Sequence, residues 1–413
     1  MENSFPSVAS SKHADRTIQM LTELTDNMKP SSSPKSAIKL SIGDPTVDGN
    51  IKAPQVLVDA LVEATKSFEF NGYPPVAGYD ETRATVAEYL ERFCQTSERK
   101  ANLKPEHVLI TSGGSHAIVL AITAICNEGD NLILTAPAFP HYKAVCDSYG
   151  IECRYLPMKA NQHWQVDLEQ AERLVDERTR VICMINPSNP CGSNWSREHV
   201  TDIVRFCERK HLPIISDEIY SELIFKGETF TSVADIDTSV PRVLLGGGAK
   251  HVVVPGWRIG WLCLVDPAGC AAAWMNGMDR LSQLHTGANS VCQAAFTKAL
   301  LHTPQSHLDG MIAELEKGAA VYNRLLEHDI GISFDAPRAS MFVMLHVEYD
   351  LFSDVHTDME FYEKLLDEEN VQLMPGMIFG MDGFLRATIS RPSAVLNEAV
   401  DRIIAFCNRH KKA

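Results

Sequence analysis

Short apolar runs alternate with amphipathic helical segments from about residue 105 to 265, and this alternation constrains the fold more than any other feature. The apolar runs cover residues 107–111, 131–135, 151–155, 181–185, 212–216 and 243–245. Runs of this kind are typical of buried strands. Strands that alternate with helices predict an α/β fold, with a mostly parallel sheet covered by helices on both faces. The carboxyl ends of such strands meet at one edge of the sheet, where ligands bind.

Two of these strand ends carry residues that suit a small ligand. Ser112-Gly113-Gly114-Ser115 follows the first run and opens a helix, so the free amides at Gly114 and Ser115 form a candidate anion site. After residues 131–135, Phe139 stands between two prolines and is a candidate for a ligand-contacting aromatic. Many α/β turns look like the first motif, and a core position is the alternative for Phe139.

Two further strand ends combine a tight turn, an acid and a phenol. Asn186-Pro187-Ser188-Asn189-Pro190-Cys191-Gly192 follows residues 181–185 and predicts a turn that presents amides to the crevice. Asp217 follows the run 212–216, and a carboxylate at the end of a buried strand is costly unless it meets a cation or a donor. Asp217 is therefore a site candidate. Tyr220 lies three residues further on, and Glu218 suits a structural role.

The last apolar run leads into a glycine loop that carries a lysine. Gly246-Gly247-Gly248-Ala249-Lys250 is followed, after a Pro-Gly turn, by Arg258. A lysine in apolar surroundings is shifted toward its neutral, nucleophilic amine, and the arginine fork suits a phosphate. Lys250 and Arg258 together suggest a phosphorylated carbonyl cofactor held as a Schiff base. From this stretch alone, a surface lysine and a surface arginine are the alternative.

Composition limits the partners and the compartment. The 413 residues carry a formal net charge of -15, which argues against nucleic acid or an anionic membrane as a partner. No apolar run is long enough to span a bilayer. The 11 cysteines form no C-x-x-C pair and no zinc spacing, so we expect free thiols and no metal site. The first thirty residues lack an apolar signal core and are too acidic for a transit peptide, so a cytoplasmic location is expected rather than a mitochondrial one.

Five motifs occur in order along the chain: Ser-Gly-Gly-Ser, Pro-x-Phe-Pro, Asn-Pro-x-Asn-Pro-x-Gly, Ser-Asp-Glu-x-Tyr and Lys-x7-Arg. With these motifs the chain resembles the fold-type I pyridoxal-phosphate aminotransferases, and within them the tyrosine aminotransferase group. The resemblance extends from residues 38–45 to the last helix. It implies the aspartate aminotransferase-like fold, in which a large domain holds a mostly parallel seven-stranded sheet beside a smaller α+β domain. It also implies pyridoxal 5'-phosphate as the cofactor.

The resemblance implies a role toward the cofactor ring for each matching residue. Lys250 matches the lysine that forms the internal aldimine and then shuttles a proton on the substrate. Asp217 matches the carboxylate that pairs with the pyridinium nitrogen. Asn189 and Tyr220 match the pair that hydrogen-bonds the phenolic oxygen, and Phe139 matches the aromatic stacked on the ring.

Contacts to the phosphate are implied in the same way. Gly114, Ser115 and Arg258 match the phosphate cradle. Tyr73, in the rigid loop 71–78, matches a tyrosine that reaches the phosphate from the neighbouring subunit, which implies a homodimer. Without that context, Tyr73 is interpreted as a loop tyrosine that caps the core.

The substrate side matches the family less completely. Arg386 matches the arginine that grips the substrate carboxylate in a bidentate fork, with an exposed strand arginine as the alternative, and Gly43 is assigned to the same site. Many family members carry Ser or Thr three residues before the lysine, where this chain has Gly247. No arginine matches the one that aspartate aminotransferases use for a second carboxylate, although His285 or Arg391 could bind one.

The resemblance also divides the chain. Residues 1–37 form an N-terminal arm, with a short helix predicted between residues 17 and 28. Residues 38–74 and 311–413 form the small domain, in which strands are expected at 341–345 and 384–389 and a closing helix at 395–409. Residues 75–310 form the large domain that binds the cofactor.

The resulting hypothesis is a homodimeric aminotransferase that moves the amino group of tyrosine or another aromatic or broad-range amino acid to a 2-oxo acid by ping-pong kinetics. Its partners are small molecules, with 2-oxoglutarate, pyruvate or oxaloacetate as the acceptor. An alanine-type aminotransferase and a pyridoxal-phosphate-dependent β-lyase of cysteine conjugates are the alternatives that use the same residues. A non-catalytic protein that binds the cofactor is a third, but the joint presence of Lys250, Asp217 and Arg386 argues against it.

Overall fold

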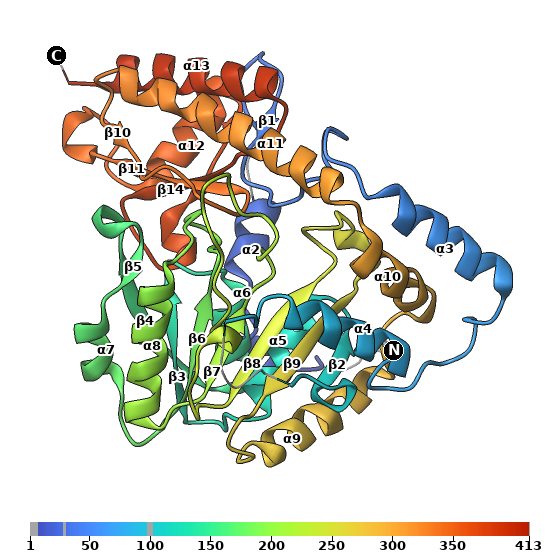
Figure 1. Ribbon diagram of the computed structural model, residues 1–413. Helices are drawn as coiled ribbons and strands as arrows, with labels where there is room; N and C mark the ends of the chain where they lie inside the picture. Colours follow the sequence, from blue (N-terminus) through green and yellow to red (C-terminus); the bar gives the residue numbers. More distant parts are fainter. Residues whose placement is uncertain (1–6, 28–29, 97–101, 413) are drawn as a thin grey trace, which may run out of the picture.

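The computed structural model describes residues 7–27, 30–96 and 102–412 (Figure 1). Its largest sheet has eight strands in the order β2-β9-β8-β7-β6-β3-β4-β5. Their bounds are β2 (Val108–Thr111), β3 (Asn131–Ala136), β4 (Glu152–Lys159), β5 (Gln165–Val166), β6 (Thr179–Ile185), β7 (Ile214–Asp217), β8 (Arg242–Gly247) and β9 (Gly260–Val265). Neighbouring strands from β4 to β8 are parallel, whereas β9 runs antiparallel to both β8 and β2. The mostly parallel sheet is therefore confirmed.

The sheet has one strand more than the seven expected. The additional strand is β5, a two-residue edge strand that pairs antiparallel with β4 through Val166 and Met158. A strand this short shows no alternation that a sequence pattern can reveal. The other seven strands match the expected number.

Two apolar cores lie on opposite faces of this sheet, because successive strand residues point to opposite sides. In β3, Ile133 packs into one core, and Leu132 and Leu134 pack into the other. The first core takes in α4 (Asp80–Glu91), α7 (Leu168–Leu174), α8 (Arg197–Lys210) and α10 (Ser290–His302), and the second takes in α5 (Gly114–Thr123), α6 (His141–Tyr149) and α9 (Ala272–Ser282). Burial on both faces explains the continuous apolar runs in the sequence.

A second, smaller sheet is built from the C-terminal part of the chain (Figure 1). Its antiparallel strands follow the order β10 (Ile332–Ser333), β11 (Phe342–Val347), β14 (Phe384–Thr388) and β13 (Met374–Pro375). They share a core with α11 (Gln305–Tyr322), α12 (Asp358–Glu369) and α13 (Ser393–His410). Beside them, β1 (Ile38–Lys39) pairs in parallel with β12 (Val371–Gln372), which joins the start of the chain to this region.

Helix α3 (Gln55–Ser67) lies away from the smaller sheet. It packs against α10, and Leu57 and Ala60 belong to a core of the large sheet (Figure 1). The division into a small domain of residues 38–74 and 311–413 and a large domain of residues 75–310 stays a prediction. It assigns α3 to the small domain, whereas α3 packs on the core of the large sheet.

In the described part of the N-terminal arm, α1 and α2 both pack against the rest of the protein. α1 (Lys12–Arg16) packs against α6, and Thr17 Oγ1 donates to Ser148 Oγ at 2.9 Å. α2 (Met20–Asp26) occupies the place of the helix expected between residues 17 and 28, of which residue 28 lies outside the described ranges. Leu21 and Leu24 of α2 pack against the side chains of β13 and of the turn that follows it.

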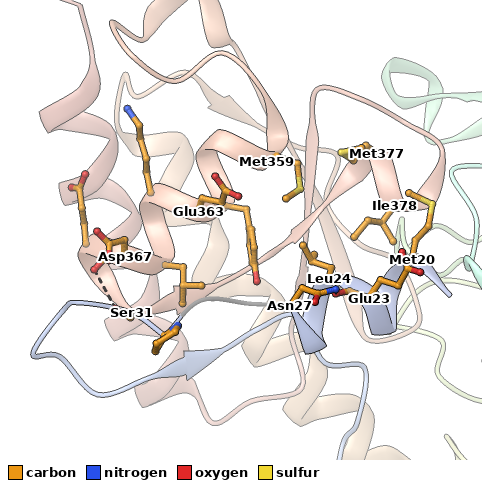
Figure 2. A pocket seen from close by; sticks show the side chains of 15 residues that line it. Met20, Glu23, Leu24, Asn27, Ser31, Met359, Glu363, Asp367, Met377 and Ile378 are labelled. Atoms are coloured by element: carbon orange, nitrogen blue, oxygen red, sulfur yellow. Dashed lines mark hydrogen bonds between the residues drawn. The ribbon is translucent and has the colours of Figure 1, made fainter. Parts of the chain in front are cut away.

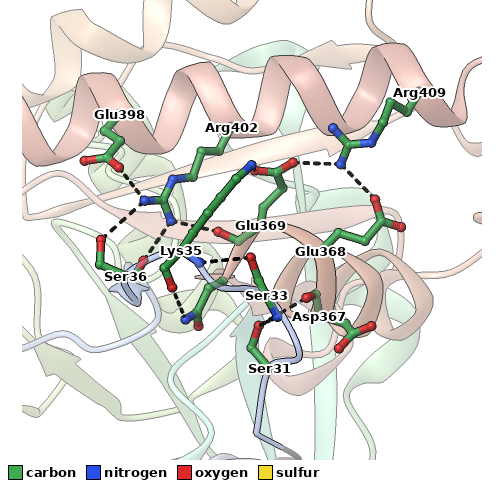
Figure 3. A network of polar contacts seen from close by, with 11 residues as sticks. Ser31, Ser33, Lys35, Ser36, Asp367, Glu368, Glu369, Glu398, Arg402 and Arg409 are labelled. Atoms are coloured by element: carbon green, nitrogen blue, oxygen red, sulfur yellow. Dashed lines mark hydrogen bonds and ion pairs between the residues drawn. The ribbon is translucent and has the colours of Figure 1, made fainter.

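A polar network fixes residues 31–36 to α12 and α13 (Figure 3). Glu369 is 1% exposed and is paired with both Lys35 and Arg409. Arg402 Nη1 donates to the carbonyl oxygens of Ser36 and Glu369, each at 2.8 Å. A buried carboxylate is tolerated when cations and donors surround it in this way. The network therefore holds the segment directly before β1 against α12 and α13.

Across the ranges that the structure covers, no helix is long and apolar enough to cross a membrane. The same ranges contain no group of three or more His, Cys, Asp or Glu side chains that could hold a metal ion. All 11 cysteines are free thiols.

Candidate active site

A cavity of about 590 Å³ lies where the carboxyl ends of the large-sheet strands face the smaller sheet. Side chains or backbone of nearly all the candidate residues line it: Gly43, Gly114, Ser115, Phe139, Asn189, Asp217, Tyr220, Lys250, Arg258 and Arg386. The exception is Tyr73, which is 89% exposed and lies outside this cavity. The fold therefore brings residues from positions 43 to 386 together around one space.

Lys250 lies in the loop after β8, at the centre of the cavity wall. Its Nζ donates a hydrogen bond to the carbonyl oxygen of Gly43 at 2.7 Å. Burial lowers the pKa of Lys250 to about 8, and the nearby charge of Arg386 acts in the same direction. A lysine with this pKa has a larger share of neutral amine near neutral pH than an ordinary lysine, and the neutral amine is the form that attacks a carbonyl carbon.

Asp217 ends β7 and is buried. Its carboxylate accepts hydrogen bonds from Tyr142 Oη at 3.1 Å and from the Ile219 amide at 3.2 Å. Burial raises the pKa of Asp217 to about 6. Among the described residues, the one charge that offsets its burial is that of Lys250, so a cationic ligand atom at this place would relieve the remaining cost.

Tyr220 and Asn189 present hydrogen-bond donors beside the lysine. The Tyr220 ring lies 5.7 Å from Lys250 Nζ, and burial raises the pKa of its phenol well above the ordinary value, so the hydroxyl keeps its proton. Asn189 Oδ1 accepts from Arg386 Nη1 at 3.0 Å. This bond assigns the amide oxygen to Arg386, and the Nδ2 group of Asn189 then has its protons available to donate. Both side chains can therefore donate to an acceptor oxygen in the cavity.

An anion cradle occupies the end of the cavity beside α5. Gly114 and Ser115 are the first residues of α5, where amides have no acceptor in a preceding turn. Arg258 Nη2 donates to Ser115 Oγ at 2.9 Å. Gly113 has φ of +77°, and a Cβ on it would lie 2.4 Å from Arg258 Nη2, so glycine is required for the guanidinium to come this close. Two amides, a hydroxyl and a guanidinium form a site for a phosphate.

The glycine that departs from the family pattern has a steric cause. A Cβ on Gly247 would lie 2.8 Å from the carbonyl oxygen of Ile259 and 3.0 Å from Gly260 Cα. β8 and β9 pair at this point, with Gly247 opposite Gly260. A serine or threonine would clash with the backbone here, so its hydroxyl cannot contribute to the cradle.

Arg386 lies on β14 and reaches the cavity from the smaller sheet. Its guanidinium donates to Asn189 and to the carbonyl oxygen of Ser41. The guanidinium carbon lies 4.3 Å from the ring centre of Phe342 and 4.7 Å from that of Phe379. Burial lowers the pKa of Arg386 to about 10, and its Nε has no hydrogen-bond partner. A carboxylate ligand would complete the bonding of this cation.

The remaining candidates lie on the cavity wall or outside it. Phe139 is half-buried beside the cradle, with its ring centre 6.0 Å from that of His141. His285 and Arg391 do not line the cavity. His285 packs against His116 with ring centres 4.1 Å apart, and Arg391 is paired with Asp48.

Several residues that line the cavity or support its wall carry no motif in the sequence. Tyr142 and Phe342 support the site, as described above for Asp217 and Arg386. Leu21, Thr22 and Thr25 line the cavity from α2, far from the other residues in the sequence. A buried carboxylate such as Asp217 needs donors, but Tyr142 follows β3, which is separated from β7 by β6, so only the tertiary structure shows that it is the donor.

A second cavity, of about 740 Å³, lies behind α2 (Figure 2). Met20, Glu23 and Leu24 of α2 and Asn27 directly after it face this cavity, opposite Met359, Glu363 and Asp367 of α12. α2 therefore separates this cavity from the one that contains Lys250.

The chemistry of the first cavity fits pyridoxal 5'-phosphate. The cradle on α5 suits its phosphate, the unpaired carboxylate of Asp217 suits a protonated ring nitrogen, and the donors of Asn189 and Tyr220 suit its phenolic oxygen. Lys250 supplies the amine for its aldehyde. These groups are all present and are held by elements of one sheet.

Comparison with known proteins supports the same identification. The family model of aminotransferase class I and II matches residues 35–403. A tyrosine aminotransferase of Dictyostelium discoideum is 36% identical over 413 residues, covering 98% of this chain and 97% of its own. That of Mus musculus is 34% identical over 405 residues, covering 98% and 88%. A crystal structure of tyrosine aminotransferase from Leishmania infantum is 60% identical, covers 99% of this chain and 100% of its own, and has a TM-score of 0.97.

These matches extend over nearly the whole chain, as the five motifs predict. The aspartate aminotransferase-like fold is confirmed, and so is pyridoxal phosphate, the cofactor of this family. The chain is an enzyme and belongs to the class I and II aminotransferases.

Proposed function

We propose that this enzyme moves the amino group of tyrosine or another aromatic amino acid to a 2-oxo acid, and that it does so by ping-pong kinetics. The observation that carries the proposal is the cavity in which Lys250, Asp217 and Arg386 meet, in a chain 60% identical to a tyrosine aminotransferase of known structure. The amino acid and the 2-oxo acid would bind to the same cavity in turn.

Each residue has a distinct task in this proposal. When bound, pyridoxal phosphate supplies an electron sink for the α-carbon of the amino acid. The Lys250 amine holds the cofactor at rest and carries the proton at the α-carbon during turnover. The Asp217 carboxylate keeps the ring nitrogen protonated, and Phe139 covers the ring. Arg386 binds the α-carboxylate in a fork, which orients the α-hydrogen toward Lys250.

The lining of the cavity favours an aromatic or neutral side chain. Among the described residues that line it, the only cations are Lys250, Arg258 and Arg386, and each already has a task. Ile42, Leu21 and Ile118 supply apolar surface. A second carboxylate of 2-oxoglutarate would need a cation from outside this set, such as His285 or Arg391.

A homodimer in the cytoplasm is part of the proposal. Tyr73 is 89% exposed and Leu284 is 80% exposed, which suits a surface that meets a second copy of the chain. The cradle at α5 would be completed by Tyr73 of that second copy. Analytical ultracentrifugation of wild type and Tyr73→Phe, with the affinity for pyridoxal phosphate measured in parallel, tests the dimer and the tyrosine separately.

A panel of amino donors against pyruvate, oxaloacetate and 2-oxoglutarate tests the proposed reaction. We expect the highest kcat/KM for tyrosine or another aromatic donor. A preference for alanine would overturn the aromatic assignment in favour of an alanine-type enzyme. Release of pyruvate and ammonia from a cysteine conjugate without any acceptor acid would identify a β-lyase instead.

A further inference from the structure

Ser340 occupies an unusual position between the two halves of the site. It is fully buried and has φ of +60°, the left-handed region that costs a non-glycine residue energy. It immediately precedes the segment that enters β11 and lies two residues before Phe342. A residue held in this conformation must be stabilised by the contacts around it.

The Ser340 hydroxyl is bound to the loop that carries Asn189. Ser340 Oγ donates to the carbonyl oxygen of Ser188 at 2.9 Å, and that carbonyl belongs to the peptide group that leads into Asn189. The Ser340 amide donates to the carbonyl oxygen of Leu223 at 2.9 Å. Rotation of the 188–189 peptide would break the first bond, so Ser340 limits the movement of Asn189.

The segment around Ser340 is packed closely on the same loop. The amides of Arg338 and Ala339 donate to the carbonyl oxygen of Gly192, at 2.8 and 3.0 Å. A Cβ on Gly192 would lie 2.3 Å from the carbonyl oxygen of Phe342, so only glycine allows this approach. The loop 188–192 and residues 338–342 therefore behave as one unit.

This unit contains Asn189, which the proposed reaction needs at the cofactor, and it contacts Arg386, which the reaction needs at the substrate carboxylate. Phe342 lies under the Arg386 guanidinium at 4.3 Å, and Asn189 accepts from Arg386 at 3.0 Å. The bond from Ser340 to the Ser188 carbonyl joins the loop of Asn189 to the strand of Phe342.

We propose that Ser340 is a positioning residue, which sets Asn189 toward the phenolic oxygen of the cofactor and Arg386 toward the substrate carboxylate. This inference rests on the proposed function of those two residues. Ser340 touches neither substrate nor cofactor. It acts through the Ser188 carbonyl on one side and through Phe342 on the other.

The test compares Ser340→Ala and Ser340→Gly with Thr297→Val in the holoenzyme. Thr297 also has a buried hydroxyl that donates to a backbone carbonyl, that of Gln293 at 2.9 Å, but it lies in α10 and does not line the cavity. Ser340→Gly removes the hydroxyl and also the cost of the left-handed backbone, so it provides a folded variant if Ser340→Ala is unstable.

Four quantities are measured for each variant: the pH midpoint of the absorbance change of the bound cofactor, KM and kcat for the amino donor, and Tm. We expect both Ser340 variants to raise the pH midpoint by about 0.5 to 1 unit, because a weakened hydrogen bond from Asn189 raises proton affinity on the cofactor. We expect KM to rise by about 3- to 10-fold, more than kcat falls. Thr297→Val should lower Tm without changing the midpoint or KM.

An unchanged midpoint and KM in both Ser340 variants, with Tm lowered as in Thr297→Val, would overturn the positioning role and leave the proposed function intact. Failure of the wild-type protein to show any cofactor absorbance would instead overturn the proposed function, and the inference about Ser340 with it.

Discussion

The two ends of the active-site cavity are built in different ways. At the cofactor end, Asp217 ends β7, and Asn189 and Lys250 lie in the loops after β6 and β8; these three are adjacent parallel strands of one sheet. At the carboxylate end, Arg386 comes from the smaller sheet, Gly43 from the segment after β1, and α2 from the N-terminal arm. Cofactor contacts therefore depend on one rigid element, whereas substrate contacts depend on three separate segments.

Because the two ends are built differently, we expect them to control different kinetic constants. Strand ends in a common sheet keep their spacing, because each strand is hydrogen-bonded to the next along its length. The segments at the carboxylate end meet only through side-chain packing and a few hydrogen bonds, such as those from Arg386 to Asn189 and Ser41. We expect changes at the cofactor end to act mainly on kcat and changes at the carboxylate end mainly on KM or on substrate preference.

The largest effect is expected at Lys250. Lys250→Ala removes the amine that holds the cofactor and carries the proton, so kcat should fall by about 10⁴-fold or more. Steady-state kinetics with the best amino donor measures this, and circular dichroism checks that the fold is unchanged. Full activity in the variant would show that Lys250 has no catalytic role.

A somewhat smaller effect is expected at Asp217. Asp217→Asn removes the charge that stabilises a protonated ring nitrogen, and kcat should fall by about 10²- to 10³-fold with little change in KM. Tyr142→Phe is the matched variant, since it removes only the neutral hydrogen bond to Asp217 and should cost less than about 10-fold. Equal losses in the two variants would contradict an electrostatic role for the carboxylate.

At the carboxylate end, Arg386→Ala should act on binding. Loss of a buried bidentate partner should raise KM by about 100-fold, with a smaller change in kcat. Arg386→Lys keeps the charge but loses the fork, so it should give an intermediate KM. An unchanged KM in Arg386→Ala would exclude this arginine from carboxylate binding.

Stability of the cofactor-free protein tests the burial of Lys250. The pKa of Lys250 is about 8 in the folded chain against 10.5 for an ordinary lysine, so between these values the unfolded chain binds more protons. The free energy of unfolding should therefore rise with pH from about 8 to 10.5. Below pH 8, Lys250→Met should be more stable than wild type by roughly 2 to 3 kcal/mol, and the difference should shrink toward pH 10.5. Denaturant unfolding at a series of pH values measures it, and a difference independent of pH would contradict the shifted pKa.

The smallest effect is expected in the arm. Leu21 and Leu24 both pack against the small core beside β13, but only Leu21 lines the cavity with Lys250. Leu21→Ala should change the ratio of kcat/KM between an aromatic and an aliphatic donor by about 3- to 10-fold. Leu24→Ala should leave that ratio unchanged, and equal shifts in both variants would show a general loosening of the arm.

The contrast between the cofactor end and the carboxylate end also explains which site residues can be predicted from the sequence. The residues of the cofactor end follow apolar runs that any parallel sheet would bury, so Asp217 and Lys250 stand out by their position alone. The contacts of Tyr142 and Phe342 depend on tertiary packing between elements and have no local pattern. The packing of α3 on α10 escapes prediction for the same reason, and β5 escapes it because two residues are too few to show an alternation.

Reduction of the holoenzyme with borohydride, followed by peptide mass spectrometry, tests the central claim most directly. The account predicts that the phosphopyridoxyl group is fixed to Lys250 in the wild-type protein and is absent from that peptide in Lys250→Ala. Labelling of a different lysine, or no covalent label on protein saturated with pyridoxal phosphate, would contradict it.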